Sequence, residues 1–109
     1  MKKIPLHWPQ PTWARRRPLA SALATRTQRL RVGVRVTGNT YRHPAVLTNM
    51  GATVDQIAHG RLEFGVGAGW HEQEHAMYGL PLYAPAERIH RLDEACALIQ
   101  LRARYGCMR

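Results

Sequence analysis

The chain has 109 residues, enough for one small domain with a modest hydrophobic core. Its formal net charge of +9 is uneven, because residues 1–54 hold ten Lys or Arg and no acidic residue, whereas residues 55–109 hold six basic and seven acidic residues. The sparse aromatic residues of the basic half match no nucleic-acid recognition module, so the composition argues against nucleic-acid binding.

Cys96 and Cys107 lack CxxC spacing, which predicts free thiols in a reducing compartment. No apolar run approaches the roughly 20 residues that a membrane-spanning helix needs. Residues 14–24 resemble a signal segment in their arginines and small residues, but Pro18 breaks an already short apolar stretch. These features predict a cytoplasmic protein that does not contact a membrane.

The first 40 residues predict an arm, a short helix and a strand. Residues 1–17 mix prolines, tryptophans and basic residues without a period, which predicts an unpatterned basic arm. The alanine-rich residues 19–28 predict a short helix. From Leu30 to Val36, leucine and valine alternate with arginine and glycine, which predicts a strand that ends in turn residues at 37–40.

A helix and a second strand come next. Pro44 suits a first helical position, and apolar residues recur at helical spacing until residues 59–60. The strand at residues 62–66 follows at once. A crossover helix of this length predicts parallel strands, whose loops at 37–43 and 67–73 open at one carboxyl-terminal edge. Parallel α/β folds bind their ligands at that edge.

Two more helices are expected, near Glu74–Tyr78 and from Pro85 to about Leu101. Two parallel strands do not make a stable sheet alone, because their faces and edges need cover. We therefore expect a fragment of a larger α/β protein, or a chain that completes its sheet with another chain, which leaves a homo-oligomer open.

The stretch from residue 61 to residue 75, RLEFGVGAGWHEQEH, is the clearest candidate site. Gly65, Gly67 and Gly69 remove side chains where a ligand can approach the backbone. The spacing is not the dinucleotide-binding fingerprint, because Trp70 stands where that motif needs its third glycine. A glycine-rich strand end is also typical of an ordinary tight turn.

Three blocks of the sequence resemble a known enzyme family. They are RLRVGVRVTGNTYRHPAVL, ATVDQIAHGRLEFGVGAGWHEQEH and YGLPLYAPAERIHRLDEAC, and they resemble the bacterial luciferase-like flavin monooxygenases and deazaflavin-dependent oxidoreductases. The resemblance implies an α/β fold that is part of a (β/α)8 barrel, a fold that typically needs about 250 residues. It assigns the third and fourth strands to residues 18–101, between the basic arm and an unpatterned tail at 102–109.

In that family, the loops after these two strands hold a flavin or deazaflavin ring. The resemblance implies a non-prolyl cis peptide at about residues 34–39, an acidic position near the cofactor at Glu74 and a phosphate-binding arginine at Arg88. The positions that it implies as cofactor-binding are Thr37, Gly38, Asn39, Gly67, Ala68, Gly69, Trp70, Glu74 and Arg88.

The family's chemistry is hydride transfer between the cofactor and a small organic substrate, or oxygen activation for monooxygenation. The block TGNTYRHP favours the deazaflavin coenzyme F-420 over FMN. Arg35, Gly51 and Gln73 depart from the usual pattern; the first places a charge near the barrel interior, and the second weakens a helix by about 1 kcal/mol relative to alanine. Without counterparts of the other strands, no catalytic residue is assigned, and we expect the chain to be inactive alone.

Residues 71–75, HEQEH, also satisfy the zinc-binding motif HExxH of metallopeptidases. That motif belongs inside a long helix, whereas here it follows a glycine-rich strand end. We therefore interpret it as the solvated first turn of a short helix and predict no metal site. The sequence is also compatible with a non-catalytic α/β remnant, or with a module that binds a partner chain.

Overall fold

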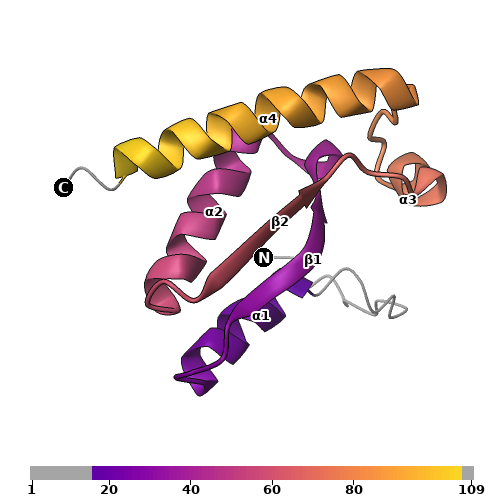
Figure 1. Ribbon diagram of the computed structural model, residues 1–109. Coiled ribbons are helices and arrows are strands. Elements are labelled where there is room, and N and C mark those ends of the chain that lie inside the picture. The colour runs from indigo at the N-terminus through magenta and orange to yellow at the C-terminus, as the bar shows by residue number, and fades with distance from the viewer. Residues whose placement is uncertain (1–15, 107–109) are drawn as a thin grey trace, which may run out of the picture.

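Two parallel strands lie at the centre of the computed structural model, which describes residues 16–106 (Figure 1). The predicted basic arm therefore lies outside the described residues except at its end, where α1 begins. The elements in chain order are α1 (Arg16–Arg26), β1 (Val32–Gly38), a 3₁₀ turn η1 (Asn39–Tyr41), α2 (Pro44–Ile57), β2 (Leu62–Gly67), α3 (Glu72–Met77) and α4 (Pro85–Gly106).

The strands pair in parallel, which confirms the prediction. The pairing runs from Val32 opposite Leu62 to the two glycines that end the strands. The register shifts within β1, and a non-prolyl cis peptide bond joins Arg35 to Val36 at that point. This bond lies within residues 34–39, where the family resemblance implies one.

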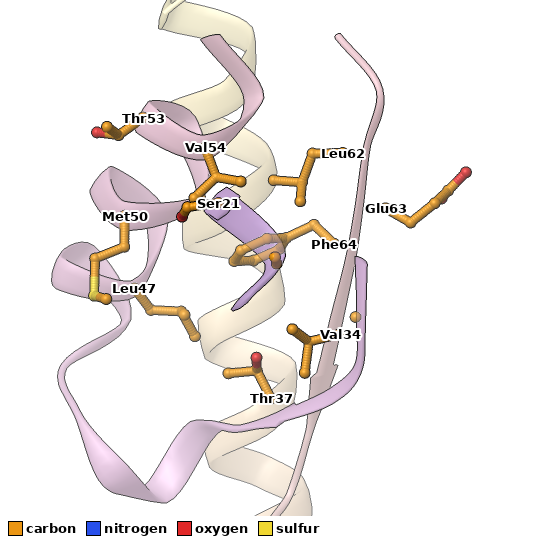
Figure 2. Close-up of a pocket in the computed structure, with 13 residues that line it drawn as sticks. Ser21, Val34, Thr37, Leu47, Met50, Thr53, Val54, Leu62, Glu63 and Phe64 are labelled. Carbon is orange, nitrogen blue, oxygen red and sulfur yellow. The ribbon is translucent and has the colours of Figure 1, made fainter. Parts of the chain in front are cut away.

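The helices cover one face of the sheet. α1 contacts β1, α2 contacts β2, and α4 crosses over α2. Figure 2 shows Val34, Leu62 and Phe64 pointing from the strands toward α2, whose Leu47 and Val54 point back toward them. Val34, Leu62 and Phe64 therefore face the helices, as a period of two predicts. Val36 departs from the predicted alternation: it follows the cis peptide bond and the register shift, is 52% exposed, and lies beside Gly65 and Gly67 on the other face.

Gly51 has a packing reason in the middle of α2. A Cβ atom built there would lie 2.5 Å from Cε2 of Phe64, closer than two carbon atoms can approach. The residue that lowers helix propensity therefore leaves room for the phenylalanine ring.

The hydrophobic core is small. Large apolar side chains such as Leu30, Ile89 and Leu101 are exposed, and Arg35 is exposed as well. On the sheet face away from the helices, Arg31 pairs with Glu63, and both side chains are mostly in solvent. Four of the six buried apolar residues that the structure describes are alanines: Ala20, Ala24, Val32, Leu47, Ala58 and Ala95.

The helix ends differ from the predicted ones. α3 begins at Glu72, two residues early, because the His71 side chain caps it by accepting a hydrogen bond from the Glu74 N–H (3.2 Å). α4 continues past Leu101 to Gly106, since its last turns hold strong helix formers and a basic residue, Arg104, that suits the carboxyl end of a helix. Within residues 16–106, every helix is too short or too polar to cross a membrane.

Arg61 joins the elements at the amino-terminal edge of the sheet. Its guanidinium donates to the carbonyl oxygens of Ala24, Thr27, Leu30 and Ala58 at 2.6–2.9 Å, and to Oγ1 of Thr27 at 3.1 Å. One side chain thus ties the end of α1 to the turn between α2 and β2. Nothing in the local sequence pattern points to this role for the arginine.

Candidate functional site

The loops that follow β1 and β2 meet at one edge of the sheet, as predicted. Gly38 lies opposite Gly67 in the strand pairing, and η1 and the loop at 68–71 continue from these glycines. A Cβ atom built at Gly69 would lie 2.6 Å from Oγ1 of Thr40. The structure therefore brings the two predicted cofactor loops into direct contact.

The glycines of β2 and its loop make room for the chain's own side chains. A Cβ atom at Gly67 would lie 2.8 Å from Cγ2 of Val36, and one at Gly65 would lie 3.2 Å from Cγ1 of the same valine. Gly69 also has a φ of +83°, a backbone conformation that favours glycine. The prediction that a ligand fills this space is therefore incomplete, because Val36 and Thr40 already occupy part of it.

Glu74 and His75 are buried, so the prediction of a solvated first turn is wrong for these two residues. Glu74 is 8% exposed and accepts a hydrogen bond of 2.5 Å at Oε2 from the Tyr41 hydroxyl. His75 is 1% exposed, and its ring lies 4.7 Å from the Tyr41 ring, measured between centroids. These two residues are buried because they contact Tyr41 and Thr40 of η1, a tertiary contact that the local sequence does not specify.

Both ring nitrogens of His75 have partners. Nε2 lies 2.7 Å from Oγ1 of Thr40, and Nδ1 lies 2.7 Å from the backbone oxygen of His71. The other histidine of HExxH, His71, uses its Nδ1 to cap α3. Among the described residues, no group of three or more His, Cys, Asp and Glu could hold a metal ion.

The first turns of α4 contact both loops. Arg88 donates from Nη1 to the backbone oxygen of Gly69 at 2.5 Å, and Asn39 donates from Nδ2 to the backbone oxygen of Arg91 at 3.3 Å. Within residues 16–106, Nε of Arg88 and Oδ1 of Asn39 are buried without a hydrogen-bond partner. A buried polar atom without a partner is costly, so these two atoms mark where a polar ligand group can bind.

Trp70 and Thr37 have opposite placements. The Trp70 side chain is 80% exposed, and its ring lies 4.9 Å from the His71 ring. Thr37 is buried and points into an apolar cavity of about 320 Å³ between the sheet, α1 and α2 (Figure 2). Its side chain is thus turned away from the loops, and only its backbone lies at the edge.

The Tyr41 hydroxyl gives a pH-dependent test of this geometry. Burial, and next the hydrogen bond and charge of Glu74, raise the pKa of Tyr41 well above its ordinary value. The folded chain therefore holds this proton more tightly than the unfolded chain. Its contribution to stability is complete below about pH 10, and it is lost as the pH rises toward the folded-state pKa.

We expect the wild-type chain to lose stability more steeply above about pH 10 than Tyr41→Phe, which lacks this proton. Urea denaturation from pH 8 to pH 11 measures the difference, and absorbance at 295 nm reports tyrosinate. Equal slopes for the two chains, or a Tyr41 that ionises before unfolding, would contradict the buried hydrogen bond.

Comparisons with known proteins show the family of this chain. The sequence profile described as luciferase-like monooxygenase matches residues 7–106. The chain belongs to the luciferase-like monooxygenase family. The match extends beyond residues 18–101, the segment that the resemblance assigned to the barrel, at both ends. The predicted fold class, an α/β barrel fragment with two parallel strands and their helices, is confirmed.

Several family members are similar to this chain. An F420-dependent glucose-6-phosphate dehydrogenase from Beutenbergia cavernae is 42% identical over 84 residues, which are 76% of this chain and 25% of that protein. A limonene 1,2-monooxygenase from Rhodococcus erythropolis is 30% identical over 79 residues, which are 72% of this chain and 20% of that protein. The chain thus spans a quarter or less of the length of these family members.

A solved structure of the same family shows a similar fold. The monooxygenase RslO1 from Streptomyces bottropensis superimposes with a TM-score of 0.66 and is 26% identical in sequence. The similarity covers 76% of this chain and 24% of RslO1. The two parallel strands and their helices therefore correspond to about a quarter of that monooxygenase.

Proposed function

We propose that this chain forms one side of the cofactor site of a luciferase-like oxidoreductase with a (β/α)8 barrel. The observation that carries the proposal is the contact between the loops after β1 and β2 at one edge of a parallel sheet, where such folds bind ligands. The names of two similar proteins, from Beutenbergia cavernae and Amycolatopsis mediterranei, include dependence on F420. They support the deazaflavin coenzyme F-420 as the cofactor, with FMN as the alternative.

The polar atoms of the edge fit such a cofactor. Oδ1 of Asn39 lacks a partner among the described residues and can accept from a ring N–H group, whereas Nε of Arg88 can donate to a phosphate oxygen. The exposed indole of Trp70 offers a flat surface to an aromatic ring. We propose that the backbones of Thr37, Gly38, Gly67, Ala68 and Gly69 complete this cofactor-binding surface.

The bound cofactor would supply hydride transfer or, as reduced flavin, oxygen activation. The residues of this chain bind the ring, orient it and exclude water from one side. Glu74 acts indirectly, because its carboxylate accepts a hydrogen bond from the Tyr41 hydroxyl and so holds that side chain in place. The substrate is a small organic molecule whose contacts and catalytic groups come from strands other than β1 and β2.

The same argument limits the activity of the isolated chain. Its two strands supply one part of a barrel, so we propose that it binds the cofactor weakly and has no turnover alone. A non-catalytic remnant that binds a partner chain is the second candidate, which the exposed apolar residues and the open sheet edges favour. A homo-oligomer would also cover these exposed apolar residues and sheet edges. We further propose that the protein is cytoplasmic.

The test is a titration of the purified 109-residue chain with coenzyme F-420 and, separately, with FMN. Cofactor fluorescence reports binding, while circular dichroism and a size measurement report the fold and the assembly. Saturable binding of one cofactor by a folded species would support the cofactor site and would identify its ligand. A folded chain that binds neither cofactor would contradict the proposal and favour the partner-binding remnant.

Trp70→Ala is expected to weaken cofactor binding about 2- to 10-fold, because stacked aromatic pairs contribute roughly 0.5–1.5 kcal/mol. The measurement uses the same titration. Met77→Ala is the matched control, since Met77 is an equally exposed apolar residue on the neighbouring helix. An equal loss of affinity in both variants would assign the effect to general destabilisation.

A further inference from the structure

Two side-chain hydrogen bonds cross from η1 to α3. The Tyr41 hydroxyl donates to Oε2 of Glu74, and Oγ1 of Thr40 lies 2.7 Å from Nε2 of His75. The partners of each pair are more than 30 residues apart in the sequence, and α3 supplies a buried residue to each pair. The strand pairing ends at Gly38 and Gly67. Beyond that point, these two pairs join the loops.

The His71 backbone fixes the tautomer of His75. Nδ1 of His75 lies 2.7 Å from a carbonyl oxygen, which can only accept a hydrogen bond, so Nδ1 carries the proton. In the neutral ring, Nε2 is then an acceptor, and the Thr40 hydroxyl donates a hydrogen bond to it. Both ring nitrogens of His75 are thus satisfied while η1 stays in place against α3.

The polar pairs act together with α4, which contacts both loops through Arg88 and Asn39. Between the loops themselves, Gly69 approaches Thr40 too closely for any larger side chain. An apolar contact tolerates sliding, whereas a buried hydrogen bond loses its energy after a small displacement and leaves its partner unsatisfied. The pairs therefore constrain the position of η1 relative to α3.

We propose that Thr40–His75 and Tyr41–Glu74 form a clamp between the loops after β1 and β2, with Nδ1–H of His75 donating to the backbone oxygen of His71. The four side chains are positioning residues, because they set the cofactor edge without themselves forming its surface. What the edge binds rests on the proposed function, but the clamp itself does not.

The experiment follows the ring nitrogens of His75 by ¹⁵N NMR in the full chain at pH 8, in wild type, Thr40→Val and Thr40→Ser. Valine keeps the shape of threonine without its hydroxyl, whereas serine keeps the hydroxyl. We expect the Nδ1–H tautomer in wild type and Thr40→Ser, and a shifted Nε2 signal in Thr40→Val alone. Coenzyme F-420 affinity, measured where all variants are folded, should fall about 10-fold in Thr40→Val and recover in Thr40→Ser.

Each outcome either supports or contradicts the proposed clamp. An Nε2–H tautomer in wild type, an unchanged Nε2 signal in Thr40→Val, or an unfolded wild-type chain would overturn it. Thr40→Val that shifts the signal but keeps full cofactor affinity would overturn the positioning role. If wild type binds no cofactor, the proposed function fails, and the NMR signals of the three chains still decide whether the clamp exists. Glu72→Gln, on an exposed residue of the same helix, is the control that should leave all signals unchanged.

Discussion

Gly69→Ala is expected to lower the free energy of unfolding by roughly 2–5 kcal/mol and to abolish cofactor binding. Two effects add at this position. The residue has a φ of +83°, where a residue with a Cβ atom costs roughly 1–2 kcal/mol. The new Cβ would also lie 2.6 Å from Oγ1 of Thr40, and overpacking typically costs about 1–3 kcal/mol.

The chain offers matched controls that separate these effects. Gly60 and Gly79 also have positive φ values, +77° and +65°, but a Cβ atom built at either position meets no atom within 4 Å. Gly60→Ala and Gly79→Ala should therefore show the backbone cost alone. Urea denaturation of the three variants measures stability, and the coenzyme titration measures the site.

The controls also test the reason for the loss of binding. Gly60 lies between α2 and β2, at the opposite end of the sheet from the loops. Gly60→Ala should keep its cofactor affinity in the folded fraction, whereas Gly69→Ala should lose it because the methyl group separates the loops. Equal stability for all three variants would show that Thr40 does not approach Gly69 as closely as the structure shows.

The sequence predicted the elements of this fold better than their contacts. The alternation in β1, the helical spacing after Pro44 and the glycine at residue 60 each reflect local chemistry, and the structure agrees with them. The parallel pairing followed from the length of the crossover. The end of α4 was missed because apolar periodicity stops at Leu101, whereas the backbone continues to Gly106 on helix propensity alone.

The predicted site was incomplete for a different reason. Glycines and an exposed tryptophan can be recognised one at a time, but a hydrogen bond between residues 40 and 75 depends on the assembled fold. The sequence predicted a solvated His75, whereas the structure buries this residue and gives it a structural role. The available signal was the polar pair Thr40-Tyr41 just after one strand, together with a histidine and a carboxylate just after the next. Residues in these positions meet at the carboxyl edge of a parallel sheet.

Arg61→Met is expected to destabilise the chain by about 3–4 kcal/mol, which is a large share of the stability of a small domain. Each hydrogen bond from a charged donor contributes roughly 1.5–3 kcal/mol, and Arg61 makes five. The contributions do not add fully, because some of the freed carbonyl oxygens of α1 and the following turn regain water. With so few buried apolar residues, this chain has little other energy to hold α1 against the turn before β2.

Arg61→Lys separates charge from geometry. Lysine keeps the positive charge, but its single ammonium group cannot reach carbonyl oxygens on three sides as the planar guanidinium does. We therefore expect Arg61→Lys to recover less than half of the loss in a thermal or urea denaturation experiment. Arg31→Met is the control, since Arg31 makes an exposed ion pair with Glu63 that should contribute about 1 kcal/mol or less. Full recovery by lysine would mean that charge alone stabilises this edge, and a loss in Arg31→Met as large as in Arg61→Met would contradict the central role of the guanidinium.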